Sequence, residues 1–98
     1  MKIYLDDERK CPNGWVLTKT ATTAIWLLKN NKVTEISLDH DLGLDDETGN
    51  DVILWIEKMV YTTDYIPPKI HIHTANSSAR VKMELAKKSI ERKRKWAE

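Results

Sequence analysis

Residues 35–43 read Glu-Ile-Ser-Leu-Asp-His-Asp-Leu-Gly, an apolar stretch that passes directly into acidic residues. The apolar residues before Asp39 predict a short β-strand that ends at this aspartate. The N-terminus repeats the arrangement, because a strand-like stretch over residues 2–6 leads into Asp6 and Asp7. The chain is therefore expected to carry carboxylates at the ends of two strands.

Two further strands and three helices are predicted around these stretches. The further strands cover residues 15–18 and 69–73, and helices begin at Thr20, after Gly49, and at Asn76 or Ser77. Each helical stretch has apolar residues every three or four positions, as in an amphipathic helix. Strands that alternate with helices predict a parallel sheet of the α/β class, here in one domain over residues 1–98. We expect Trp15, Trp26 and Trp55 to pack in its core.

Acidic side chains at two strand ends predict a metal site. In an open parallel sheet, binding sites form beyond the carboxyl ends of the strands. Carboxylates that gather there repel one another unless a cation neutralises them, and hard oxygen ligands suit Mg²⁺ or Mn²⁺. We expect Asp6, Asp7 and Asp39 to be the metal ligands. Asp6 and Asp7 also fit a plain turn after a strand.

Histidines supply candidates for proton transfer. His71 and His73 alternate with isoleucines, so both imidazoles are expected on one side of their strand. His71 fits a half-exposed strand position. His73 stands at the strand end, and together with His40 it is a candidate for acid–base chemistry near neutral pH. Asp39, His40 and His73 are thus the catalytic candidates.

The start of the last predicted helix is a candidate phosphate site. Asn76 fits a helix cap, and free backbone amides at a helix start also suit an anion. Thr74 adds a hydroxyl before this cap. Arg80, one turn into the helix, and Arg9, after the first strand, are candidates for phosphate contacts or for surface ion pairs.

Composition narrows the class of protein. The 98 residues carry a net charge of +1. The charges are unevenly distributed, with an acidic stretch at residues 39–51 and a basic end at residues 87–98 of the last predicted helix. No apolar run approaches the ~20 residues that span a bilayer, and no signal-peptide core precedes the first strand, so we expect a cytoplasmic protein without membrane contact. The lone Cys11 excludes an internal disulfide, and without a cysteine pair or a close His-x₃-His pattern zinc is not expected.

The strand-end residues resemble those of the receiver domain of two-component signalling. In that family an acidic pair after the first strand binds Mg²⁺, an aspartate after the third accepts a phosphoryl group, and a threonine after the next contacts it. Asp6, Asp7, Asp39 and Thr74 match these places. A fifth strand with its lysine and a final helix have no counterpart, so orthodox phosphorelay signalling is not expected.

A fuller resemblance is to cyclic-phosphate-processing receiver domains. The stretches that look like that family's signature are residues 5–9 (Leu-Asp-Asp-Glu-Arg), 37–43 (Ser-Leu-Asp-His-Asp-Leu-Gly), 48–51 (Thr-Gly-Asn-Asp) and 72–76 (Ile-His-Thr-Ala-Asn). The resemblance implies a reduced flavodoxin-like domain of two or three layers, with a four-stranded parallel sheet of order 2-1-3-4 and about three helices. Right-handed crossovers place the first two helices on one face. We expect the C-terminal helix, or the second subunit of a homodimer, to cover the other.

The same resemblance implies a metal-dependent phosphoesterase, a hydrolase that acts on a cyclic phosphate such as a 2′,3′-cyclic nucleotide or an RNA end. Asp6, Asp7 and Asp39 would hold Mg²⁺ or Mn²⁺, the two histidines would transfer protons, and the residues that would hold the phosphate are Thr74, Asn76, Arg80 and Arg9. Two alternatives stay open. One is a non-catalytic module that binds a nucleotide, an RNA end or a protein partner, and the other is a phosphoacceptor switch at Asp39.

Overall fold

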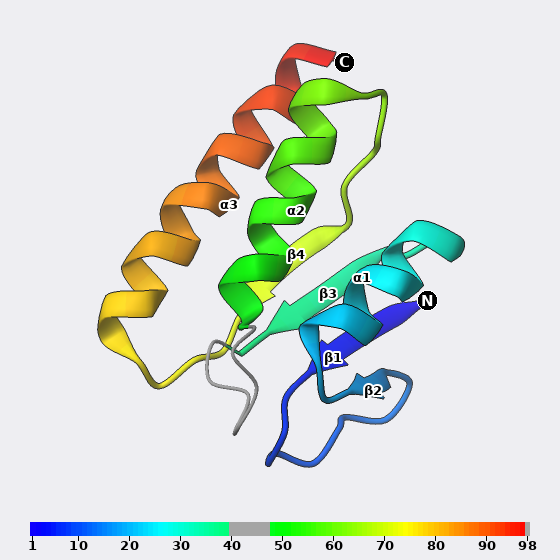
Figure 1. Cartoon of the computed structure of the whole chain (residues 1–98), viewed down its shortest axis with the longest axis vertical. Coiled ribbons are helices and arrows are strands. Elements are labelled where there is room, and N and C mark those ends of the chain that lie inside the picture. The colour runs from blue at the N-terminus through cyan, green and yellow to red at the C-terminus, as the bar shows by residue number, and fades with distance from the viewer. Residues whose placement is uncertain (40–47, 98) are drawn as a thin grey trace.

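Four parallel strands and three helices make up the part of the chain that the computed structural model describes, which is residues 1–39 and 48–97, with side chains to residue 93 (Figure 1). In chain order they are β1 (Lys2–Leu5), β2 (Val16–Thr18), α1 (Ala21–Asn30), β3 (Glu35–Leu38), α2 (Gly49–Thr62), β4 (Lys69–Ile72) and α3 (Ser77–Ala97). The strand order is β2-β1-β3-β4, and all three pairings are parallel. This confirms the predicted α/β class and the 2-1-3-4 order.

The register of the sheet decides which side chains share a face. Leu5 pairs with Leu38, which pairs with Ile72, and all three are buried toward the helices. Because side chains alternate along a strand, the residues that follow these three lie on the opposite side. The next cross-strand row is Asp6, Asp39 and His73, at the carboxyl edge of the sheet.

The three helices lie on one face of the sheet. Figure 1 shows α2 and α3 side by side, and α1 packs against α2, β1 and β2. The apolar stripe of α3 joins the common core through Met83, Ala86 and Ile90. The prediction that the C-terminal helix covers the other face is therefore wrong, while cover by a second subunit stays a prediction. None of the described helices is long and apolar enough to cross a membrane.

The face without helices is lined by aromatic and polar side chains. Trp15 lies edge-on to Tyr4 and to His71, with ring centroids 6.3 and 6.1 Å apart, and Lys2 lies 5.7 Å from its ring. Trp15 is thus half-buried on this face and not in the main core. The expectation of a core position is wrong for Trp26, which is 60% exposed because α1 buries Ala21, Ala24 and Leu28 instead.

Each helix begins at the carboxyl edge of the sheet, with a side chain that satisfies free backbone amides. The Thr20 hydroxyl accepts from the Thr23 amide at α1, and the Asn76 carboxamide accepts from the Ala79 amide at α3. At α2 the Asp51 carboxylate accepts from the Thr48 amide. The positive ends of three helix dipoles therefore face the strand ends, and Asn76 is confirmed as a cap.

Candidate functional site

Asp6 is the buried anchor of the site. It follows β1 and is only 1% exposed, and its Oδ1 accepts hydrogen bonds of 2.8 Å from the backbone amides of Glu8 and Arg9. Its Oδ2 lies 3.0 Å from His73 Nε2 and 3.8 Å from Arg9 Nε. Burial raises the pKa of this carboxyl, but the two amides and His73 outweigh burial and leave the pKa below its usual value. Asp6 is therefore ionised at neutral pH.

Asp39 is placed by the sheet and by a glycine. Its amide donates to the Leu5 carbonyl at 3.1 Å, which continues the β1–β3 ladder by one residue. Gly49, the first residue of α2, lies so close to the Asp39 backbone that an added Cβ would overlap its carbonyl group. A glycine is needed here because α2 begins directly against the end of β3. These two backbone contacts place the half-buried Asp39 beside Asp6.

His73 is held by contacts on both ring nitrogens and on one ring face. Its Nδ1 lies 2.7 Å from Ser37 Oγ, and its Nε2 faces Asp6. The Tyr4 ring stacks on the imidazole at 4.5 Å, with planes 5° apart. Burial lowers the pKa of His73 below its ordinary value of 6.5, and this effect exceeds the opposing influence of Asp6 and Asp39. The imidazole is therefore neutral at pH 7.

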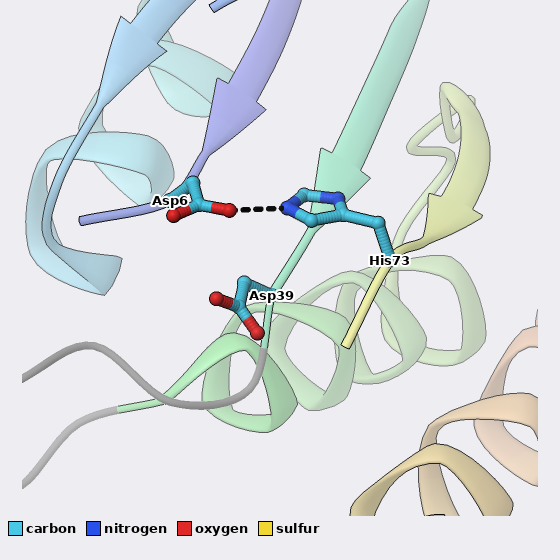
Figure 2. Close-up of side chains that lie close together, drawn as sticks. All are labelled: Asp6, Asp39 and His73. Atoms are coloured by element: carbon cyan, nitrogen blue, oxygen red, sulfur yellow. Dashed lines mark hydrogen bonds and ion pairs between the residues drawn. The ribbon is translucent and has the colours of Figure 1, made fainter. Parts of the chain in front are cut away.

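Asp6, Asp39 and His73 converge from three strand ends (Figure 2). Each offers one potential ligand atom, and these atoms lie within 4.8 Å of one another. Two of the predicted metal ligands, Asp6 and Asp39, are thus brought together. The third, Asp7, is half-buried next to them and is not in this group. His40 falls outside the described residues, so its predicted role stays a prediction.

The model of the family described as the cyclic-phosphate processing receiver domain matches residues 1–89. The chain belongs to this family. No curated protein and no solved structure gives a significant match.

In this cyclic-phosphate processing receiver domain, two of the predicted phosphate-binding residues make local contacts at the start of α3. The Thr74 hydroxyl is buried and accepts from the Asn76 amide at 3.1 Å, while the Asn76 side chain caps the helix. No hydrogen bond within the described chain uses the amides of Ser77 and Ser78, in the first turn of α3. These two amides lie where a bound anion would gain from the helix dipole.

The two arginines predicted to bind phosphate differ in their surroundings. Arg9 lies at the rim of the site with its side chain about half exposed, at 53%. Arg80 instead donates through its guanidinium to the carbonyls of Ile72 and Thr74, at 3.3 and 3.4 Å. Because β4 is an edge strand of the described sheet, these bonds satisfy carbonyls that a further strand would otherwise pair. Arg80 thus ties α3 to the loop that carries His73.

Sequence reasoning missed Ser37 and Tyr4, both of which contact His73 in this receiver domain. Ser37 is 7% exposed in the central strand β3, and Tyr4 lies in β1. The alternation that put Ile36 and Leu38 in the core also put Ser37 on the other face, which was the available signal. The contact itself depends on the His73 ring leaning across β3, and the sequence carries no sign of that rotamer.

Proposed function

We propose that this domain processes a cyclic phosphate with the help of a divalent cation held by Asp6 and Asp39. The observation that carries the proposal is the convergence of Asp6, Asp39 and His73 at the carboxyl edge, in a chain of this family. The hydrogen bonds to Asp6 keep this buried carboxylate ionised, and Asp39 places a second carboxyl group beside it, an arrangement that a cation between them would stabilise. Asp7, half-buried next to Asp6 in the chain, would act as a further ligand through a water molecule.

The bound cation would supply Lewis-acid stabilisation of the phosphoryl oxygens and would lower the pKa of a bound water. The chain itself contributes an anion cradle at the start of α3. The groups proposed to hold the phosphate all follow carboxyl ends of strands: the Ser77 and Ser78 amides, the Thr74 hydroxyl and the Arg9 guanidinium. Arg80 supports this cradle by fixing the loop before α3.

Opening a cyclic phosphate by water forms one P–O bond and breaks another. The water loses a proton, and the departing alkoxide oxygen gains one. Both ring nitrogens of His73 are already engaged by Ser37 and Asp6, so this imidazole has no free nitrogen for a substrate proton. We therefore propose that His40, and not His73, takes part in this proton transfer, while a cation held by Asp6 and Asp39 would make the attacking water more acidic.

The description of the family and the chemistry of the site support the proposed substrate class. A 2′,3′-cyclic nucleotide or an RNA end with a cyclic phosphate presents one diester to the cation and to the α3 amides. The experiment incubates the protein with 2′,3′-cyclic nucleotides and either Mn²⁺ or Mg²⁺, and follows the opened monophosphate by chromatography. Asp39→Asn should abolish turnover, and Asp64→Asn, on the exposed segment before β4, serves as the matched control.

Three outcomes separate the candidate functions. Turnover by the wild type that Asp39→Asn removes supports the proposal, and full turnover by Asp39→Asn refutes it. Binding without conversion over hours identifies a non-catalytic module instead. Phosphorylation of Asp39 by acetyl phosphate, or formation of a beryllofluoride complex at Asp39, would identify a phosphoacceptor switch.

A further inference from the structure

We propose that His73 Nε2 is the third protein ligand of the cation, and that the Ser37 hydroxyl makes this possible by changing from hydrogen-bond donor to acceptor. The inference rests on the proposed function only in that a divalent cation binds at Asp6 and Asp39. It assigns Ser37 as a positioning residue, because the hydroxyl acts on the cation through the imidazole.

The hydrogen bonds without a cation define one proton arrangement. An ionised carboxylate only accepts hydrogen bonds, so the 3.0 Å contact between Asp6 Oδ2 and His73 Nε2 needs the proton on Nε2. A neutral imidazole carries one N–H, and its Nδ1 is then an acceptor. Ser37 Oγ, 2.7 Å away, must therefore donate to Nδ1. In this state Nε2 has no lone pair to offer a metal.

A cation between Asp6 and His73 reverses both bonds. Nε2 gives up its proton and binds the cation, and Nδ1 gains a proton, so the number of protons on the ring is unchanged. Ser37 then accepts from Nδ1–H. A hydroxyl can serve in either direction by rotating its hydrogen, so Ser37 Oγ can keep its place beside Nδ1. A metal-bound histidine generally donates its other ring N–H to such a partner.

The surroundings of the ring leave little freedom apart from this exchange. Tyr4 covers one face of the imidazole at 4.5 Å, which fixes the ring plane. Ser37 is 7% exposed and His73 has a side-chain exposure of 14%, so water does not readily replace the hydroxyl. Without the Ser37 hydroxyl, His73 Nδ1 would be buried with no hydrogen-bond partner both with and without the cation. Removing the hydroxyl should therefore weaken cation binding.

Ligand chemistry then predicts which metals bind. Two carboxylates and one imidazole form a mixed oxygen and nitrogen set, which favours Mn²⁺, Co²⁺ or Zn²⁺ over Mg²⁺ or Ca²⁺. Three protein ligands also leave coordination positions open for water and for a phosphate oxygen. The expected site is thus more selective than one built from Asp6, Asp7 and Asp39 alone.

The test measures tautomer and affinity separately from turnover. Long-range ¹H–¹⁵N spectra of the histidine rings should show His73 protonated at Nε2 in the metal-free protein and at Nδ1 with saturating Zn²⁺. Calorimetry with Zn²⁺ and Mn²⁺ should show that Ser37→Ala weakens binding by about 10- to 100-fold. Ser37→Thr, which keeps the hydroxyl, should restore most of this loss.

His71→Gln is the matched control, because His71 lies on the same strand and face but bonds Glu35 at 3.0 Å. It should leave metal affinity unchanged, and thermal unfolding should show that each variant is folded. A Zn²⁺-saturated protein in which His73 keeps its Nε2 proton would overturn the inference while leaving a carboxylate-held cation intact. Equal affinity of Ser37→Ala and wild type would also overturn it. Absence of any cation binding by the wild type would overturn both proposals.

Discussion

Gly49→Ala is the substitution that most directly tests how the fold places the site. Gly49 begins α2 and lies against the backbone of Asp39, where an added Cβ would overlap the carbonyl carbon and oxygen. A backbone group cannot rotate away as a flexible side chain can, so the start of α2 and the end of β3 must separate. Asp39 would then move away from Asp6 and His73.

Two magnitudes follow from this overlap. Overpacking of a well-packed interior costs about 1–3 kcal/mol in the free energy of unfolding. For a domain of this size each kcal/mol lowers the melting temperature by about 4–8 °C. Metal affinity should fall by about 10- to 100-fold, the range seen when the support of a metal ligand is disturbed.

Gly14→Ala provides a control with a similar cost in stability but another cause. Gly14 has a φ of +86°, and an added Cβ would meet no atom within 4 Å. A residue with a Cβ is strained in this left-handed conformation by about 1–2 kcal/mol. Because Gly14 lies outside the site, this variant should lose stability without losing affinity for Mn²⁺ or Zn²⁺.

The assay pairs thermal unfolding with calorimetric titration of both variants at one pH and salt concentration. The reasoning requires a loss of stability in both and a loss of metal affinity in Gly49→Ala alone. It would be refuted by a Gly49→Ala protein that has the melting temperature of the wild type and binds the metal with the same affinity. Equal losses of affinity in the two glycine variants would show that general destabilisation, and not the position of Asp39, controls binding.

Three other predictions follow from buried or half-buried groups. The Thr18 hydroxyl is buried without a hydrogen-bond partner among the described residues, so Thr18→Val should leave the free energy of unfolding unchanged or raise it by about 1 kcal/mol in urea titrations; a clear loss would contradict this. Trp15→Ala should lower the free energy of unfolding by about 1–3 kcal/mol, because it uncovers the helix-free face of the sheet. Trp26→Ala, at a position that is 60% exposed, should change the same free energy by less than about 0.5 kcal/mol. In the metal-free protein, the pKa of His73 in the folded state lies below its ordinary value of 6.5. Between these two pKa values the unfolded chain binds a proton that the folded protein does not. The free energy of unfolding should therefore fall as the pH drops from 6.5 through the lowered pKa. A second fall should follow below pH 3.8 as Asp6, whose folded pKa is also lowered, becomes protonated; melting curves of wild type and His73→Gln check the upper window, which the variant should lack.

Sequence patterns alone determined the class of fold and the edge at which the site lies. The apolar residues before Asp6 and Asp39 predicted strands, and the alternation of strands with helices predicted a parallel sheet. The carboxyl-end rule for such sheets then predicted that the two aspartates meet. The placement of α1 and α2 on one face was also predictable, because each is followed by a parallel strand and the crossover is right-handed.

Only the tertiary structure decided the position of α3 and the partners of individual side chains. No strand follows α3 in the described chain, so the crossover rule does not assign it a face, and its apolar stripe packs beside α2 instead. Likewise, the alternation of side chains along a strand assigns His73 and Ser37 to one side of the sheet. It does not predict that the imidazole crosses β3 to reach Ser37 and Asp6. Those contacts depend on strand register and side-chain rotamers, which are set by packing between residues far apart in the sequence.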